Sequence, residues 1–459
     1  MTSEIEEPKS TGGVVARGVA ISGATNIFLR FLDIAIAVLL LRWLSIFEFG
    51  VYRLALAAYD FATGFFLSGI ENVVVSDVSG ALLKEPRAAK NLFTVYVVFL
   101  GFVAVGIAAV FFWGGNFLAS RFPGIEAYTS IVAFLFLLSP LETAYKLKFQ
   151  IFLDFGWSSA FRVLRDVSRL LSLGGLFFFF SFGVQQALWS LVFAVGFPIL
   201  VVLIGYRRES LLAIPAPSEA RQAIRNLFLR HGKWAVLDDF AANTGKNIRP
   251  FIIRLFAGTE AVAIFSVAQN LMAYTISVFP MREVLTPVLP RMADDPARLA
   301  GQIARAAKYT AAAYVLLGLA GAVAAPVIVN LLFPQYVPSL PLYYILILGL
   351  PWLGYRSVML PVFYALKHQD TLFFLTAFRL AVVTVLGVIL VYLFGVWGAA
   401  LEVLILNIIL TPAFSKALTR ILPSWHQPIS NLFTIDGADR VAYAEVKRHI
   451  GIKIRRLWS

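Results

Sequence analysis

The chain has 459 residues, of which 59% are hydrophobic and 14% are charged, and its formal net charge is +13. Its mean hydropathy of +0.80 excludes the water-soluble classes, whose chains are roughly 45–50% apolar and 25% charged. Because it has no cysteine, disulfide scaffolds, thiolate metal sites and cysteine nucleophiles are also excluded. Its histidines lie in polar connecting or tail segments, so neither a buried metal centre nor another cofactor is expected.

Twelve apolar segments are long enough to cross a bilayer as helices, which takes about 20 residues each. The first is expected to stay in the mature protein, because residues 1–18 contain acidic side chains and no short apolar core ending in a cleavage site. We therefore predict an all-α polytopic membrane protein with about twelve transmembrane helices. In chain order the segments are 21–44, 48–76, 91–113, 128–145, 160–181, 184–206, 234–256, 261–281, 309–333, 341–366, 371–394 and 396–414.

The distribution of lysine and arginine predicts the orientation of these segments, because cytoplasmic connections carry an excess of both residues. If both termini are cytoplasmic, only Arg42, Arg121 and Arg254 fall on the opposite side. In a chain this apolar, the positive net charge therefore indicates orientation in a membrane rather than nucleic-acid binding.

The longest polar connection in the middle of the chain divides the segments into six and six. We predict an N-terminal six-helix lobe over 1–206, a cytoplasmic linker over 207–233 and a C-terminal six-helix lobe over 234–420. The basic tail, 421–459, has the spacing of an amphipathic helix from Ala438 onward and is expected to lie on the anionic cytoplasmic surface of the membrane.

Three charges near the start of each half indicate an internal repeat. An even number of spans per half makes such a repeat parallel, related by an axis along the membrane normal, as in several transporters. Two unrelated six-span bundles remain the alternative. Arg42, Glu48 and Glu71 recur as Arg254, Glu260 and Glu283, each displaced by 212 residues.

Charged side chains are unusually frequent inside the predicted spans, although each costs about 2.5–3.5 kcal/mol at mid-bilayer. At helical spacing they form polar stripes on several spans, which indicates a hydrated cavity between the two lobes. Ion pairs that hold helices together are the alternative interpretation. The residues are Asn26, Arg30 and Asp33 on the first span; Arg53, Asp60 and Glu71 on the second; Arg165, Asp166 and Arg169 on the fifth; Asp239, Asn243, Lys246, Asn247 and the nearby Arg249 on the seventh; Arg356 on the tenth; Arg379 on the eleventh; and Glu402 and Asn407 on the twelfth.

The cationic members of these stripes are candidates for binding an anion, and phosphate or pyrophosphate is the chemistry that they fit best. Acidic members are candidates for proton or sodium coupling. ATP hydrolysis by this chain is not expected, because it lacks a phosphate-binding G-x-x-x-x-G-K-[ST] loop. The candidate anion-binding residues are Arg30, Arg53, Lys246, Arg249, Arg356 and Arg379, and the candidate coupling or cavity acids are Asp33, Asp60, Asp239 and Glu402.

Short sequences around the first connection of each half resemble a known family. The runs Ala24–Arg30, Leu41–Leu44 and Glu48–Tyr52 in the first half, echoed by Ile253–Gly258 and Glu260–Phe265 in the second, carry this resemblance. They are similar to the polysaccharide transporters of the multidrug/oligosaccharidyl-lipid/polysaccharide flippase superfamily, which flip precursors of O-antigen and exopolysaccharide.

The resemblance implies two six-helix lobes around a central cavity that opens alternately to the two sides of a bacterial inner membrane. The implied cargo is an oligosaccharide on a polyprenyl diphosphate, with its lipid tail in the bilayer and a polysaccharide polymerase as a candidate partner. Cationic residues of the cavity would hold the diphosphate, and Arg30, Arg53, Lys246 and Arg249 lie in segments where such residues are expected.

Two other functions stay open from the sequence. A drug or cation antiporter of the same superfamily would share the fold, although it would favour an acidic or aromatic cavity. A membrane enzyme of polysaccharide assembly, such as a polymerase or a ligase, would need catalytic carboxylates or histidines in a substantial outside loop. The longest outside connection, 114–127, offers only Arg121 and Glu126, so we expect a transporter and not an enzyme.

Overall fold

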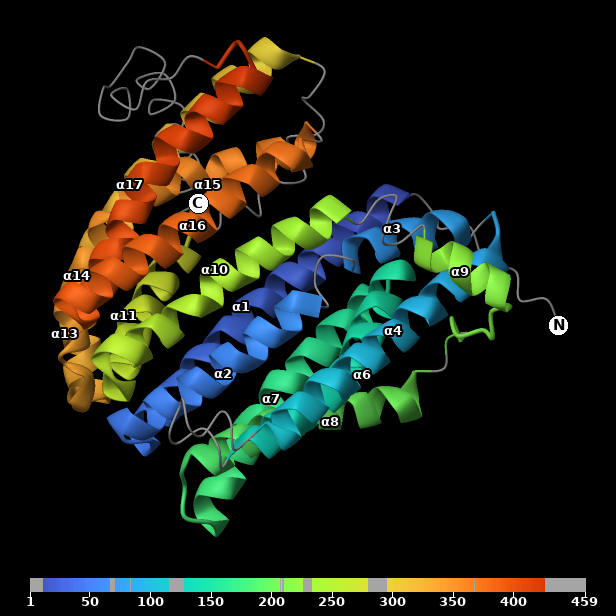
Figure 1. The fold of residues 1–459 in the computed structure, drawn as a ribbon, viewed down its shortest axis with the longest axis horizontal. Helices are drawn as coiled ribbons and strands as arrows, with labels where there is room; N and C mark the ends of the chain where they lie inside the picture. Colours follow the sequence, from blue (N-terminus) through green and yellow to red (C-terminus); the bar gives the residue numbers. More distant parts are fainter. Residues whose placement is uncertain are drawn as a thin grey trace, which may run out of the picture.

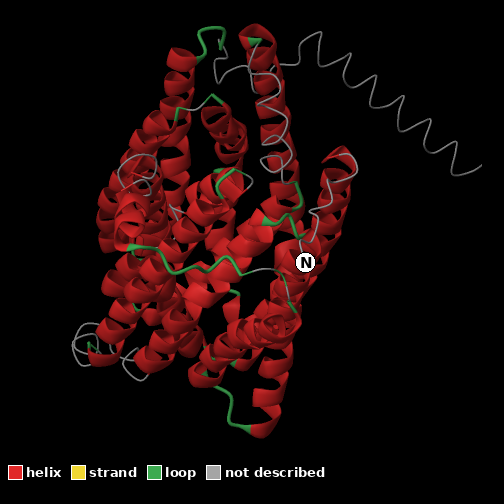
Figure 2. Cartoon of the chain, turned by 90° about the vertical axis from the view of Figure 1, so that its right-hand side faces the viewer, coloured by secondary structure: helices red, strands yellow, loops and turns green. Residues whose placement is uncertain are grey.

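The computed structural model describes residues 11–66, 71–82, 84–114, 128–206, 208, 210–225, 233–279, 295–366 and 368–425. Within these ranges the chain is helical and has no strand (Figure 2), so the predicted all-α class is confirmed. The amphipathic tail predicted from Ala438 onward, and all but Gly114 of the predicted outside connection 114–127, lie outside the described residues.

Each of the twelve predicted spans overlaps a helix or a consecutive pair of helices (Figure 1). Among the described residues, six helices are long and apolar enough to cross a membrane on those criteria alone, and a seventh candidate is α14 with α15, which are bent by 56°. The other predicted spans lie in helices that carry more charged or polar side chains. The long helices are α1 (Thr11–Trp43), α2 (Ile46–Phe66), α4 (Pro86–Trp113), α6 (Thr129–Ile151), α7 (Phe155–Phe179), α8 (Val184–Gly205), α10 (Lys233–Ala257), α11 (Thr259–Ser277), α13 (Pro296–Leu332), α14 (Ser339–Leu348), α15 (Leu350–Ala365), α16 (Gln369–Phe394) and α17 (Val396–Ile421).

Two helices cover the second predicted span: α2 ends at Phe66, and the next described helix, α3 (Glu71–Leu82), begins at Glu71. Residues 67–70 between them lie outside the described residues. That Glu71 continues the polar stripe of Arg53 and Asp60 stays a prediction. Glu71 forms an ion pair of 3.5 Å with Lys146 of α6.

The structure places the paired charges of the two halves at equivalent positions. Arg42 and Arg254 lie in the last turns of α1 and α10, and Glu48 and Glu260 lie in the first turns of the helices that follow. The third pair cannot be compared, since Glu283 lies outside the described residues.

Part of the predicted linker packs against the first half. Helix α9 (Pro217–Arg225) lies along α4, where Glu219 accepts a hydrogen bond of 2.9 Å from Asn91. Leu211 is buried in the same hydrophobic cluster as Phe93. The first half therefore extends, as a packed unit, at least to the end of α9.

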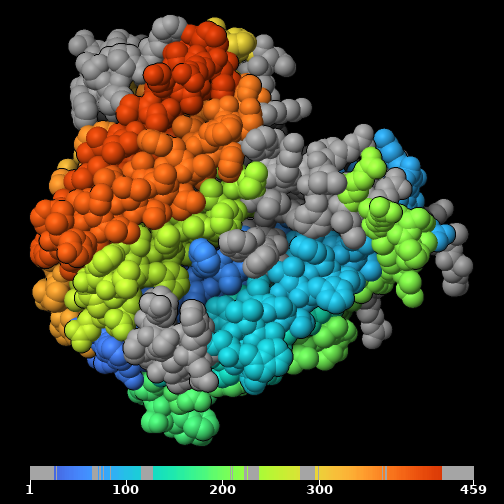
Figure 3. Space-filling model, in the orientation of Figure 1, coloured from blue at the N-terminus to red at the C-terminus, as the bar shows by residue number. Residues whose placement is uncertain are grey.

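The two halves share a hydrophobic core at one end and have separate cores at the other. The shared cluster joins residues such as Leu44 and Phe49 of the first half to Ile253 and Tyr336 of the second. Toward the end of the molecule that holds α9 and the C-terminal turn of α17, the clusters stay within one half each. Helices α15, α16 and α17 of the second half accordingly turn away from the first half toward that end (Figure 1 and Figure 3), while α10 stays packed along α2.

Close helix contacts and hydrogen bonds tie the halves together at their shared end. Helix α2 packs along α10 and α11, and a Cβ atom on Gly50 would lie 2.2 Å from the carbonyl oxygen of Thr259. The short 3₁₀ helix η4 (Pro334–Tyr336) reaches back to α1, where Gln335 Nε2 donates to the carbonyls of Leu41 and Leu44, at 2.7 and 3.1 Å. Leu41 belongs to the last turn of α1, whose carbonyls lack helical partners, and Leu44 directly follows the helix.

Replacing Gly50 with alanine should destabilise this joint by about 1–3 kcal/mol, because the new methyl group collides with a backbone oxygen that cannot move freely. The measurement is the thermal unfolding midpoint of purified protein in detergent. Gly80→Ala in α3 is the matched control, since nothing lies within 4 Å of its Cβ position and alanine is the better helix former. Equal midpoints for the two variants would contradict the close approach of α2 and α11.

Candidate functional site

Four helices of the first half bring a group of charged side chains together, which we call the N-terminal charge cluster. The side chains come from α1, α2, α6 and α7, and their interactions connect all four helices. The cluster consists of Asp33, Arg53, Asp60, Glu142, Arg162, Arg165, Asp166 and Arg169, and we include Arg30, which precedes Asp33 by three residues on the same face of α1.

One arginine of this cluster is held in an internal ion-pair network. Arg165 contacts Glu142 of α6 at 3.4 Å and Asp166 at 3.2 Å. The Asp166 side chain is only 8% exposed, so a compensating cation stabilises it. This part of the cluster matches the alternative interpretation of the sequence, in which charges hold helices together.

Four other arginines of the cluster make no close ion pair with a described residue, although Asp60 attracts Arg53, Asp33 attracts Arg169 and Asp166 attracts Arg162 electrostatically. Among the described residues, no carboxylate lies within 4.0 Å of Arg30, Arg53, Arg162 or Arg169. The buried Nε atoms of Arg53, Arg162 and Arg169 also have no hydrogen-bond partner. These arginines come from three helices of one half, and the unpartnered Nε atoms of three of them are donors available for an anion.

The neutral partners fix three of these arginines in place. Arg162 donates to Asn26 of α1 at 2.8 Å, and Arg169 donates to the hydroxyl of Tyr52 on α2. Arg30 crosses to the second half and donates to the carbonyl of Ser277 at the end of α11. The polar stripe predicted on the first span therefore divides, since Asn26 contacts α7 whereas Arg30 contacts α11.

A second group of charges lies within the other half, and we call it the C-terminal charge cluster. It consists of Arg249 on α10, Arg356 on α15, Arg379 on α16 and Glu402 on α17. Its centre is a two-bond ion pair in which Arg249 donates to Glu402 at 2.6 and 3.2 Å. Both side chains are buried, at 7% and 0% exposure. Two of the predicted site residues are thus each other's partners, which neutralises the anion-binding capacity of Arg249.

Two further arginines border this buried pair. Arg356 donates to Asn407 at 2.9 Å and stacks over the ring of Phe414, while its Nη1 atom has no hydrogen-bond partner. Arg379 lies close enough to Arg249 and Glu402 to interact with their charges, and its buried Nε atom is also unpartnered. Neither makes an ion pair with a described residue.

The remaining predicted residues lie on α10, where it faces the first half. Lys246 is exposed and attracts Asp60 of α2 electrostatically. Asp239 is half-buried and interacts with the neighbouring Asp238 and with Glu71 of α3. The ten predicted site residues therefore do not form one site: they divide between the two clusters and the face between α2 and α10.

The sequence prediction left Arg162 and Arg169 out of the anion-binding set. The signal was present, because Arg162, Asp166 and Arg169 follow one another at i, i+4 and i+7 along a single helical face. What the sequence did not show is which arginine of that face has acidic partners, since this depends on the packing of α6 and α1 against α7.

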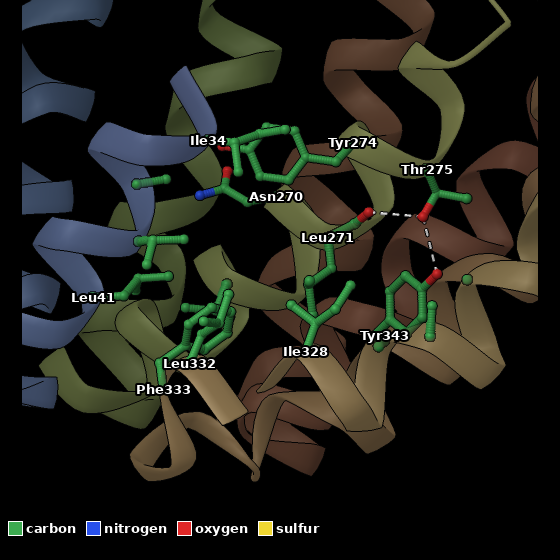
Figure 4. Close-up of a pocket in the computed structure, with 16 residues that line it drawn as sticks. Ile34, Leu41, Asn270, Leu271, Tyr274, Thr275, Ile328, Leu332, Phe333 and Tyr343 are labelled. Atoms are coloured by element: carbon green, nitrogen blue, oxygen red, sulfur yellow. Dashed lines mark hydrogen bonds between the residues drawn. The ribbon is translucent and has the colours of Figure 1, made fainter. Parts of the chain in front are cut away.

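An apolar pocket of about 250 Å³ lies where α1 of the first half meets α11, α13 and α14 of the second (Figure 4). Ile34, Leu41 and Phe333 are among its lining residues. Two of its hydroxyl groups contact each other, because Thr275 Oγ1 lies 3.0 Å from the hydroxyl of Tyr343; Thr275 Oγ1 also lies within hydrogen-bond distance of the carbonyl of Leu271. This pocket is chemically unlike the arginine-rich interior of the first half.

Residues 39–341, about two thirds of the chain, match the model of a family described as polysaccharide biosynthesis proteins. The chain belongs to this family. Among curated protein sequences, none matches it significantly. This member of the polysaccharide biosynthesis family has more arginines than acidic residues in its two charge clusters.

Solved structures show which fold this member of the polysaccharide biosynthesis family has. It superposes on the lipid II flippase MurJ in an inward closed conformation with a TM-score of 0.72 and 11% identity, covering 90% of this chain and 89% of that one. An inward-facing multidrug resistance MATE transporter gives 0.66 and 15%, covering 82% and 94%. A MOP superfamily transporter from Pyrococcus furiosus gives 0.54 and 15%, covering 91% and 94%. The protein is therefore a multi-pass membrane protein with the fold of MOP superfamily transporters.

The buried pair of this family member can be tested by removing one partner. Glu402→Ala should destabilise the protein by about 3–5 kcal/mol, because it leaves the Arg249 charge buried without compensation. The double variant Arg249→Met with Glu402→Leu should recover most of the loss, since no buried charge remains. Thermal unfolding midpoints in detergent measure both effects.

The control for that experiment is an exposed ion pair on the same molecule. Arg87 and Glu219 lie 3.7 Å apart and are 79% and 37% exposed, so Arg87→Ala should cost less than about 1 kcal/mol. If the double variant has an unfolding midpoint as low as that of Glu402→Ala, the pair contributes more to stability than the mutual neutralisation of its two charges.

Proposed function

We propose that this protein is a flippase that carries an oligosaccharide linked to a polyprenyl diphosphate across the inner membrane. In this proposal residues 1–206 and 234–420 form two lobes, both termini are cytoplasmic, and the lobes open alternately to the two sides. Membership of the polysaccharide biosynthesis family supports the substrate class. The fold that the chain shares with MurJ and MATE transporters supports movement by alternating access.

The observation that carries the proposal is the set of four arginines in the N-terminal charge cluster that have no described carboxylate within 4.0 Å. Arginine presents a planar fork that matches phosphate oxygens, and a diphosphate offers several such oxygens to more than one arginine at once. We assign the diphosphate to Arg30, Arg53, Arg162 and Arg169. Lys246 of α10 would meet the same anion from the second half, because it already interacts electrostatically with Asp60 of α2.

The second cluster has a different role in this proposal. Because Glu402 already compensates Arg249, we assign that pair to the internal stability of the second lobe. Arg356 and Arg379 keep unpartnered donors and are assigned to the sugar or to a second anionic group. Of the candidate coupling acids, Asp33 is the most exposed, which suits exchange of a proton or a cation with water.

The arrangement of the cores supports an inward-open state for the conformation described here. The shared core lies at the Trp43 end of α1, which the proposed orientation puts on the outside. Separate cores lie at the opposite end. The proposed cycle opens the shared end and brings the separate ends together.

Arg53→Ala and Arg169→Ala should each slow movement of a polyprenyl-diphosphate oligosaccharide about ten- to a hundredfold at low substrate. The reason is that a hydrogen bond to a charged group contributes about 1.5–3 kcal/mol, and about 1.4 kcal/mol is a factor of ten. The measurement is transbilayer movement in liposomes containing the purified protein. Arg169→Lys should lie between the wild type and Arg169→Ala, since it keeps the charge and loses the fork.

Arg208→Ala is the matched control, because this arginine is 59% exposed and pairs with Asp154 away from the cluster. Unfolding midpoints must stay equal across the variants. Movement of a cationic dye but not of the lipid-linked sugar would overturn the proposal in favour of a drug exporter. Lengthening of the sugar chain by the protein would instead favour a polymerase.

A reversible cross-link at the shared end should stop transport if the lobes alternate. Ser45 follows the carbonyl of Leu44 that Gln335 contacts, and the chain has no cysteine of its own. The double variant Ser45→Cys with Gln335→Cys should lose transport when treated with a bifunctional thiosulfonate reagent and regain it with a reductant. Each single variant should be unaffected, and unchanged transport in the cross-linked protein would contradict opening at this end.

A further inference from the structure

The apolar pocket between α1, α11, α13 and α14 lies directly beside a cation. On α1, Arg30 precedes the pocket-lining Ile34 by four residues, and on α11, Ser277 follows the pocket-lining Tyr274 by three. Residues three or four apart share a helical face. The hydrogen bond from Arg30 to the Ser277 carbonyl therefore crosses between the halves one turn beyond the edge of the pocket.

A second arginine borders the same edge. Arg53 interacts electrostatically with the hydroxyl of Tyr274, and the buried Nε atom of Arg53 has no partner. The site thus joins two unlike parts: an edge with two guanidinium groups and an interior lined almost entirely by carbon. That combination is complementary to an amphiphile with an anionic head and a hydrocarbon chain.

The size and openness of the pocket suit a chain segment and not a whole lipid. An apolar protein cavity of about 150 Å³ accepts benzene, with its six carbons, so about 250 Å³ holds on the order of ten carbons, which is two five-carbon isoprene units. Ile34 and Ile328 are 42% and 41% exposed at the edge of the pocket. A longer chain can therefore continue from the pocket into the bilayer.

We infer that this pocket binds the isoprenoid units nearest the phosphate of the polyprenyl carrier, with the phosphate at Arg30 and Arg53. This inference rests on the proposed function and adds where the lipid chain is held. On binding, Arg30 exchanges the Ser277 carbonyl for a phosphate oxygen, which is the stronger partner because it is charged. Occupation of the pocket thereby releases this hydrogen bond between α1 and α11.

The test is photo-cross-linking of the full-length protein in nanodiscs with a polyprenyl phosphate that carries a diazirine on its first isoprene unit. Mass spectrometry should locate the adducts on pocket residues such as Ile34, Leu271 and Ile328. Unlabelled polyprenyl phosphate should compete, and phosphatidylglycerol at the same concentration should not. Equal competition by the phospholipid would overturn the inference, since the pocket would then hold ordinary acyl chains.

Ala324→Phe should reduce these adducts at least fivefold by filling the pocket, because Ala324 lines it and is exposed enough to accept a larger side chain. Ala320→Phe is the matched control, one turn away on the same helix, exposed and outside the lining. Arg30→Ala should weaken labelling without filling the pocket. Full labelling of Ala324→Phe would overturn the inference.

This experiment separates failure of the inference from failure of the proposed function. Labelling elsewhere, in a protein that still moves the lipid-linked sugar, would contradict the pocket inference and support the flippase proposal. Specific labelling of the pocket in a protein that moves no sugar would support the pocket inference and contradict the flippase proposal. Binding and movement are measured on the same preparation.

Discussion

The energetic cost of an uncompensated charge within an apolar, membrane-spanning bundle is the constraint on which the rest of this structure depends. Where a charge serves only the fold, it is matched, as Arg249 is by Glu402 and Arg165 is by Glu142 and Asp166. Arg30, Arg162 and Arg169 donate to carbonyl, amide and hydroxyl groups, and neither they nor Arg53 has a described carboxylate within 4.0 Å. Such groups orient an arginine without neutralising it. The excess positive charge of the first half is thus a cost that packing does not explain and that an anionic substrate would offset.

The distribution of hydrophobic contacts complements this excess of charge. A core shared at one end only leaves each half internally packed toward the other end. Each half can then move as a unit, because its own clusters stay intact while the shared contacts change. A charge cluster built within one half also keeps its geometry during such a movement, whereas residues on opposite halves, such as Asp60 and Lys246, change their separation. This difference favours the N-terminal charge cluster as the persistent site and the α2–α10 face as the part that responds to conformation.

The sequence predicted the class of fold and nearly every helix, because hydropathy and charge in a membrane protein follow directly from the cost of exposing backbone and side-chain polar groups to lipid. For the site it selected Arg249 and omitted Arg162, because helical spacing shows which face a residue occupies and not which neighbour it meets. Ion pairing between residues 153 positions apart, as for Arg249 and Glu402, is decided by tertiary packing alone.

Helix α1 is the element through which these features meet. It contacts α7 within its own half through Asn26, and it contacts the other half through Arg30 and through its C-terminal carbonyls. Each of these hydrogen bonds to the other half uses a backbone carbonyl as the acceptor, not a carboxylate. Breaking such a bond leaves a neutral group that water or a neighbouring donor can satisfy, whereas breaking a buried ion pair would leave a charge. Because the halves are joined through neutral acceptors, the free energy of binding one anionic lipid is enough to separate them.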